Sequence, residues 1–438
     1  MKPVRLSELH LGKRVNNTSW KVNNLLYAAG PALVNTIRIG ITLTEPIDEQ
    51  ALRSALSKTA QRYPYFAVRL SRRGEDYVME YNPLPFVVSP DGNTVTLGAE
   101  ESNFHIFAFA YEGCRIFLDT AHFFTDGNGM FPFLKTLLYY YLQTVHPEVH
   151  FETAGIALAG SEIPAEEAED DPYPAEPFPE QPLGTLARPA SVFQLSDQPQ
   201  GYENADGWTS FRFRIRQKDM MAFVSSVDGS PATFIASLIY KTIADAHPET
   251  ELPMVCGMQH QFRQALGAPL SHMCHVNIVP IIYPDRLRGR DVEQLNTIAR
   301  GSLILRADDV SDLLTVNAHI RNENRIRGMK LSEKRKYMHQ VILDGIGVNT
   351  FEVSYTGRVP WSGLDRYILD VAPYFDLTLS GGLSVEIFSV GRDFSVNIMQ
   401  RSPTTEYVDR FSALLREYGI EYVAELPEHF SLCSFTLR

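Results

Sequence analysis

The sequence is poor in cysteine and has fewer basic than acidic residues. Its 438 residues include only four cysteines, which lie far apart and form no CxxC pair: Cys114, Cys256, Cys274 and Cys433. This usage offers no disulfide framework and favours a reducing compartment. Lysine and arginine total 40 against 52 aspartates and glutamates, which gives a net charge of −12 at pH 7. Because nucleic-acid binding needs a basic face, we expect no nucleic-acid partner, although a local basic pocket can still hold a small anion.

Long apolar runs are missing as well. No segment reaches the roughly 20 apolar residues that span a membrane, and the opening MKPVRLSELH lacks the apolar region of a signal peptide. We therefore expect no membrane span and a cytoplasmic protein. Hydrophobic residues make up 44% and charged residues 21% of the chain, as in ordinary globular proteins. The length predicts two domains rather than one core, and we expect the chain to act as a monomer.

The first block of the chain alternates strand and helix signals. The β-branched, alternating stretch 35–43 predicts a strand. Asp48 is the expected N-cap of the helix that follows, and this helix ends before Pro64, because the residue before a proline avoids helical angles. The stretches 105–111 and 114–122 flank a Glu-Gly pair and predict a β-hairpin.

An acidic, proline-rich segment separates this block from a second one. From about 159 to 184 the sequence is dense in Glu, Asp and Pro, as in EIPAEEAEDDPYPAEPFPEQP. Such a composition cannot bury enough apolar surface to fold alone, so we expect a solvated linker or crossover. A second block begins near Trp208 and contains a helix with Ser230 as its N-cap and Pro231 at its first position. We predict an N-terminal domain at 1–158, a linker at 159–205 and a C-terminal domain at 206–438.

The stretch AHFFTDGNGM, residues 121–130, carries the clearest chemistry. It joins an apolar strand pattern to an apolar helix pattern, so we expect His122 and Asp126 at a strand-to-helix corner. A neutral histidine can take a proton from a hydroxyl or amine as that group attacks. Asp126 either orients this histidine or fixes the loop by pairing with an arginine elsewhere. Gly127 permits backbone angles that a side chain forbids, and the N-terminus of the helix favours developing negative charge. A core histidine beside an Asp-Gly turn is the plain structural alternative.

These residues resemble a known family. HFFTDG matches the HxxxDG motif of the acyltransferase superfamily that includes chloramphenicol acetyltransferase, the plant BAHD enzymes and peptide-synthetase condensation domains. The chain looks most like stand-alone bacterial members described as alcohol acetyltransferases. The resemblance covers nearly the whole chain and extends to later segments of these proteins, here RYPYFAVRL, SPATFIASLIYKTIA, CGMQHQFRQAL, CHVNIVP and FEVSYTGRV.

The resemblance implies an α/β fold, in which two α+β two-layer sandwiches in one chain form a pseudo-dimer with a tunnel at their interface. It implies that His122 is the general base on an acceptor hydroxyl or amine. The acyl donor is then a thioester, on coenzyme A or on an acyl carrier protein, and no cofactor stays bound. Asp126 is more structural than catalytic in this family and is expected to pair with Arg263.

The resemblance also suggests where an oxyanion is stabilised. Asn277, or a hydroxyl among Ser354, Tyr355 and Thr356, is a candidate for this role or for contact with the acceptor. Two departures stand against closer kinship with particular branches. Ala121 replaces the second histidine common in condensation domains, and the DFGWG segment of the plant enzymes is absent. The alternative is an inactive member that binds a ligand or partner, but the intact motif favours an enzyme.

Two weaker features complete the sequence. The basic stretch 321–336 contains Arg325, Arg327 and Lys330, which are candidates for binding the donor's phosphates; a solvated helix face is the alternative. His272, Cys274 and His275 lie close together in the sequence, with Cys256 and His260 just upstream. Alternate residues of a strand face opposite ways and supply no tetrahedral ligand set, so we expect no metal.

Overall fold

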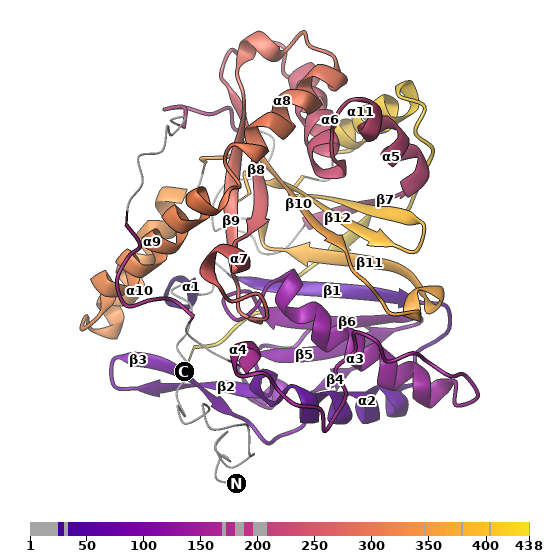
Figure 1. Ribbon diagram of the computed structural model, residues 1–438, viewed down its shortest axis with the longest axis vertical. Helices are drawn as coiled ribbons and strands as arrows, with labels where there is room; N and C mark the ends of the chain where they lie inside the picture. The colour runs from indigo at the N-terminus through magenta and orange to yellow at the C-terminus, as the bar shows by residue number, and fades with distance from the viewer. Residues whose placement is uncertain are drawn as a thin grey trace.

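Two β-sheets organise the molecule, one in the lower and one in the upper half of Figure 1. The computed structural model describes residues 25–29, 34–168, 172–179, 188–195, 208–345, 347–377, 380–402 and 404–437.

The first sheet has the strand order β11-β1-β6-β5-β4. Its strands are β1 (Thr36–Leu43), β4 (Val88–Ser89), β5 (Phe107–Glu112), β6 (Arg115–Ala121) and β11 (Ile368–Phe375). The helices α2 (Glu49–Arg62) and α3 (Gly127–Val145) share one hydrophobic core with Ile37, Ile39 and Ile41 of β1. A separate ribbon of β2 (Val68–Arg73) and β3 (Asp76–Tyr81) and the short helix α1 (Leu25–Ala28) lie beside this unit. The alternation of TIRIGITL therefore directs its isoleucines into the core, as a strand period predicts.

The second sheet is larger. Its order is β14-β7-β13-β12-β10-β8-β9, and β15 also pairs with β7. The strands are β7 (Trp208–Arg216), β8 (Met254–Gln261), β9 (Val276–Tyr283), β10 (Phe351–Arg358), β12 (Leu383–Val390), β13 (Asp393–Gln400), β14 (Tyr422–Ala424) and β15 (Glu428–Phe430). The helices α5 (Gln217–Ser226), α6 (Pro231–Ala246), α8 (Val292–Ile304) and α11 (Glu406–Glu417) contribute to its core. The strand β10 runs parallel to both β8 and β12.

Segments from the second half of the sequence complete the first unit. The strand β11 pairs antiparallel with β1, so that Ile37 lies opposite Phe375. The helix α9 (Asp309–Ile326) ends, and α10 (Leu331–Gly345) begins, with residues buried in the core of the first sheet, among them Ile326 and Leu331. Figure 1 shows β11 at the edge of the first sheet, on the side of β1 that faces the second sheet. The domain limits near 158 and 206 stay a prediction, but the two halves share a sheet and a core.

The acidic segment is attached to the fold where it is described. The short helix α4 (Ala165–Ala168) places Glu167 in a two-pronged ion pair with Arg62, at 2.8 and 2.9 Å. Farther along, the backbone N–H of Phe178 donates to Asn317 at 2.7 Å. The segment stays a predicted linker or crossover, but Glu167 and Phe178 hold parts of it to the two halves. Residues 169–171, 180–187 and 196–205 of this segment lie outside the described residues.

Several local predictions are confirmed. Asp48 caps α2 by accepting from the N–H of Ala51, and Ser230 caps α6 with Pro231 in its first turn. The predicted hairpin is β5 and β6. Within the described ranges, no helix is by itself long and apolar enough to cross a membrane; α5 and α6 together pass by length and composition, with a bend of 85° between them.

Candidate functional site

The corner between β6 and α3 is held by its own backbone. Ala121 ends β6, and the N–H of His122 donates to the carbonyl of Asn35 at 2.8 Å, next to the start of β1. Asp126 is the N-cap of α3 and accepts from the N–H of Gly129 at 2.9 Å. The helix therefore begins at Gly127, directly after the motif aspartate and five residues after His122, and its first turn lies at the corner.

Close approach explains the glycines of this corner. Gly127 is the first residue of α3 and does not have a positive φ. Gly127 therefore does not use the backbone freedom that the sequence permits it. A Cβ at Gly127 lies 3.1 Å from the methyl group of Thr356, and a Cβ at Gly129 lies 2.0 Å from the carbonyl oxygen of His272. The absence of side chains thus lets the second half of the chain pack directly against the first turn of α3.

The imidazole of His122 has one nitrogen fixed. Its Nδ1 lies 3.2 Å from the carbonyl oxygen of Thr125 and 3.7 Å from Sγ of Cys274. A carbonyl only accepts, so Nδ1 carries the proton and Nε2 carries the lone pair. Within the described residues, no hydrogen bond to Nε2 is formed. Burial raises the pKa of the Cys274 thiol well above its usual range, so this neighbour stays neutral. The arrangement fixes one ring nitrogen and leaves the other available to accept a proton.

Asp126 bonds away from the histidine. One carboxylate oxygen accepts from Nη2 of Arg263 at 2.7 Å, and the other accepts from the backbone N–H of His275 at 2.9 Å. Both side chains are buried, and Arg263 also donates through Nε to the carbonyl of Ser271 at 2.8 Å. Burial raises the pKa of Asp126, but Arg263 and the backbone donors outweigh it, so the pKa is lowered overall. Asp126 therefore pairs with an arginine of the second half, the one expected from the sequence, and ties the two halves together.

A cavity of about 320 Å³ opens at this corner. One wall is formed by β1, the corner and the first turn of α3, including His122 and Asp126. The rest of the lining comes from β8, β9, β10 and β12 of the second sheet, and from Phe375 on β11, the strand that pairs with β1. The ring of Phe375 on β11 has its centroid 6.2 Å from that of His122. The base is therefore accessible from a space that both halves of the chain enclose.

The structure separates the candidates for oxyanion and acceptor contacts. Ser354, Tyr355 and Thr356 on β10 all line the cavity with His122. Asn277 lies on β9 opposite His260 and is not part of the lining, whereas its neighbour Val276 is. Asn277 is therefore not placed to contact a ligand in this cavity.

Glu386 on β12 is a lining residue that the sequence analysis missed. Its side chain is buried, and its position in the register lies opposite Ser354 of β10. Burial raises the pKa of Glu386 to about 8, despite a hydrogen bond from Ser354. Within the described residues, Oε1 has no hydrogen-bond partner. The signal was present in LSVEIFSV, where a lone glutamate interrupts a strand that is otherwise apolar and small.

The remaining candidates lie outside this cavity. Arg325, Arg327 and Lys330 are exposed where α9 gives way to α10, and none of them lines the cavity. The guanidinium of Arg325 lies over the ring of Tyr337, 5.6 Å from its centroid.

The residues weighed as metal ligands have other partners. His275 bonds Ser271 at 2.9 Å and Tyr173 at 3.1 Å through its two ring nitrogens, and Nδ1 of His272 bonds the carbonyl of Glu167 at 2.9 Å. In the described part of the chain, no group of three or more His, Cys, Asp or Glu side chains is placed to hold a metal ion.

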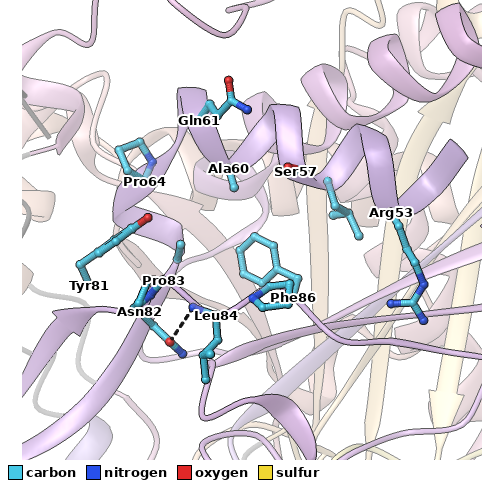
Figure 2. A pocket seen from close by; sticks show the side chains of 13 residues that line it. Arg53, Ser57, Ala60, Gln61, Pro64, Tyr81, Asn82, Pro83, Leu84 and Phe86 are labelled. Carbon is cyan, nitrogen blue, oxygen red and sulfur yellow. Dashed lines mark hydrogen bonds between the residues drawn. The ribbon is translucent and has the colours of Figure 1, made fainter. Parts of the chain in front are cut away.

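A second pocket, of about 530 Å³, lies between α2 and the loop after β3. Figure 2 shows Arg53, Gln61, Tyr81 and Asn82 around it, with the N–H of Leu84 bonded to Asn82. Its described lining residues include no histidine, cysteine or carboxylate. They therefore offer no group for proton transfer near neutral pH, whereas the His122 cavity does, and we take that cavity as the candidate active site.

Comparisons with known proteins bear on the fold. No protein-family model matches the chain, and no match is found among curated proteins. The chain is similar in structure to F. graminearum TRI101 in complex with coenzyme A and T-2 mycotoxin, with 12% identity and a TM-score of 0.61 over 93% of this chain and 100% of that one. It is also similar to polyketide synthase associated protein 5 from Mycobacterium tuberculosis, with 13% identity and a TM-score of 0.53 over 87% and 92% of the two chains.

A third similar structure is the first condensation domain of the calcium-dependent antibiotic synthetase. Its identity is 11% and its TM-score 0.58, over 92% of this chain and 96% of that domain. At this level of identity the likeness shows the fold alone. The chain therefore has the two-unit α/β pseudo-dimer fold of these structures, which confirms the predicted fold class.

Proposed function

We propose that this chain is an acyltransferase that moves an acyl group from a thioester to a hydroxyl or amine. One observation carries the proposal: His122 lines the cavity enclosed by both halves, with Nδ1 held by Thr125 and Nε2 unbonded in the described residues. Such a histidine has one tautomer and one orientation when it acts as a base, as general base catalysis requires. The HxxxDG motif, at residues 122–127, supports membership of the corresponding superfamily, near the bacterial alcohol acetyltransferases.

In the proposed reaction, Nε2 of His122 removes the proton of the acceptor as its oxygen or nitrogen attacks the thioester carbonyl. The tetrahedral intermediate then collapses, the thiolate leaves, and the imidazolium returns the proton to it. Negative charge that develops on the carbonyl oxygen is stabilised by a hydroxyl donor and by the N-terminus of α3. Asp126 does not touch the reactants in this scheme and keeps the corner in place through Arg263.

We assign the hydroxyl donor to Thr356 rather than to Ser354 or Asn277. Ser354 already bonds Glu386, and Asn277 is not in the cavity lining. Thr356 lines the cavity, packs against Gly127 at the start of α3, and has no side-chain hydrogen bond within the described residues. Thr356→Val keeps the shape and removes the donor. A fall in kcat of about 10²- to 10³-fold is expected, whereas an unchanged kcat contradicts the assignment.

The donor is proposed to be acyl coenzyme A or an acyl carrier protein. Support comes from the similar F. graminearum structures, which hold coenzyme A, and from the similar condensation domains. The acceptor is a small alcohol or amine that fits a cavity of about 320 Å³. The chain is further proposed to act as a monomer.

A thiol-release assay tests the proposal. Acetyl coenzyme A is incubated with the protein and a panel of alcohols and amines, and free thiol is measured for the wild type and for His122→Ala. The variant is expected to lose at least about 10²-fold in kcat, the effect typical of a general base. His150→Ala, at an exposed position, is the matched control and should keep full activity. Turnover by His122→Ala equal to wild type contradicts the proposal, and coenzyme A binding without thiol release by the wild type favours an inactive, ligand-binding member.

A further inference from the structure

The cavity wall contains a carboxyl group for which the proposed reaction has no use. Glu386 lines the cavity and is only 1% exposed, and its Oε1 lacks a hydrogen-bond partner in the described residues. Burying a carboxyl group without full hydrogen bonding is unfavourable, and fold stability gains nothing from it. An unpartnered buried oxygen on the wall of a cavity indicates a group that completes its bonding when a ligand enters.

The surroundings of Glu386 decide which ligand group fits. No lysine or arginine is found among the described lining residues, so the protein supplies no cation to the cavity. Instead, aromatic rings from Tyr355, Phe375 and Phe388 line it. A carboxylate together with aromatic faces is the combination that binds organic ammonium groups. A neutral hydroxyl on the ligand needs no carboxylate, because a Ser or Gln side chain binds it equally well without the cost of burying a carboxyl group. An anionic ligand group is repelled by the carboxylate.

We propose that Glu386 is a specificity-determining residue that binds an ammonium group of the acceptor, so that the substrate is a small amino alcohol or diamine. This inference rests on the proposed acyl transfer. One end of the acceptor, a hydroxyl or neutral amine, meets Nε2 of His122, and the other end, a protonated amine, pairs with Glu386. When the ammonium enters, the carboxyl group releases its proton to solvent and becomes a carboxylate.

The other ionisable groups near Glu386 are compatible with this pairing. Glu352, two residues before Ser354 on β10, is buried, and its negative charge raises the pKa of Glu386 further. On the other side, β13 places the neutral Asn397 opposite Glu386 in the register. The remaining ionisable residues of the described lining are His122, Asp126 in its pair with Arg263, Tyr355, and His260, which bonds Asp312 at 3.0 Å; burial raises the pKa of Tyr355, so its hydroxyl is neutral. An entering cation is therefore attracted by the carboxyl groups without meeting an unpaired positive charge.

The test compares acceptors that differ only in charge. Straight-chain amino alcohols are each paired with a plain alcohol of the same number of heavy atoms, and kcat/KM is measured by thiol release from acetyl coenzyme A. Wild type is expected to prefer the amino alcohol at least about tenfold. In Glu386→Gln, which keeps shape and hydrogen bonding but removes the charge, this preference should fall about 10- to 100-fold, mainly through KM. Equal use of both series by wild type, or an unchanged preference in Glu386→Gln, overturns the inference.

A matched variant and a binding measurement separate the possible failures. Glu352→Gln removes a neighbouring buried carboxyl group that does not line the cavity, and it should keep the preference within about threefold. Calorimetry with the amino alcohols measures binding without turnover. Binding by wild type that Glu386→Gln loses, with no thiol release, supports this inference and contradicts the acyltransferase proposal. Absence of amino-alcohol binding by wild type overturns the inference, whatever the turnover.

Discussion

Asp126 and Glu386 are both buried carboxyl groups on the wall of one cavity, but the fold surrounds them very differently. Asp126 accepts hydrogen bonds from Arg263 and from the backbone N–H groups of Gly129 and His275. Glu386 has the hydroxyl of Ser354 and an oxygen with no partner in the described residues. The pKa is lowered for Asp126, and burial raises it to about 8 for Glu386.

The difference in hydrogen bonding between Asp126 and Glu386 separates structural from functional polar groups in this cavity. A carboxylate whose bonds are complete has no capacity left for a ligand, so Asp126 stabilises the arrangement of the two halves. A carboxyl group with an open oxygen destabilises the folded protein by itself and binds a ligand that supplies what is missing. Sequence motifs direct attention to Asp126, whereas the chemistry of recognition is inferred from Glu386.

The strongest test of this comparison is Asp126→Asn. The substitution keeps the shape but leaves the guanidinium of Arg263 buried without a counter-charge. Loss of one partner of a buried ion pair costs about 3–5 kcal/mol, so the free energy of unfolding should fall by that amount in urea titrations. Thiol release should fall as well, because the corner that holds His122 loosens. A variant as stable as wild type shows that the pair is not structural, and the comparison then fails.

The second test uses the opposite pKa change of Glu386. Its pKa is raised from 4.5 to about 8, so between these values the folded protein binds more protons than the unfolded chain. The stability of wild type should therefore decrease as the pH rises through this window, relative to Glu386→Gln, which has no proton to lose. Each pH unit within the window corresponds to about 1.4 kcal/mol, so the difference between the two proteins grows by up to about 4 kcal/mol from pH 5 to pH 8.

Urea titrations of both proteins at several pH values measure this difference. Burial also raises the pKa of Glu352, to about 7, but that group is present in both proteins and largely cancels in the comparison. For Asp126 the sign is reversed, because its lowered pKa gives stability that is lost only as the pH falls below the ordinary value of 3.8. A pH-independent difference between wild type and Glu386→Gln contradicts the buried, unpaired state of Glu386.

The sequence predicted those parts of the site whose signals are local. One short stretch contains His122, the capping residue Asp126 and the start of the following helix. The patterns of the strand, the cap and the helix can all be recognised in it. The pairing with Arg263 needed the resemblance, since 137 residues separate the two partners. Glu386 escaped notice, because its place in the cavity depends on which face of β12 it occupies and on the pairing of β12 with β10.

The acidic segment shows the same limit of local signals. Its composition indicates a solvated chain, yet Glu167 bonds Arg62, which is 105 residues away in the sequence. The composition of a segment indicates whether the segment can fold by itself. It does not show whether arginine or lysine side chains of distant elements will pair with its carboxylates. In the same way, the need for a glycine at Gly127 comes from Thr356, a residue of the other half, and not from local backbone angles.

The smallest expected effect concerns charged groups on the outer surface, which would bind the phosphates of the donor. The described lining residues include no lysine or arginine, so the phosphates of a coenzyme A donor must be bound outside the cavity. Arg325, Arg327 and Lys330 are exposed, and α10 is anchored to the first half beside them, where the N–H of Leu331 donates to Glu75 at 2.7 Å. Exposed ion pairs often contribute only about 0.2–0.5 kcal/mol each, so replacing all three by alanine should raise the donor KM roughly 3- to 10-fold.

The acceptor KM and kcat should stay unchanged in this triple variant, because the acceptor is proposed to lie inside the cavity, between His122 and Glu386. The donor KM of wild type should also rise with ionic strength, and that of the variant should rise less, since screening acts on exposed charges. Replacement of Lys218, Arg286 and Arg290, which are also exposed, gives the same change of net charge elsewhere on the surface. A donor KM that the first variant leaves unchanged, or that the control raises equally, removes this stretch from the donor site and leaves a solvated turn.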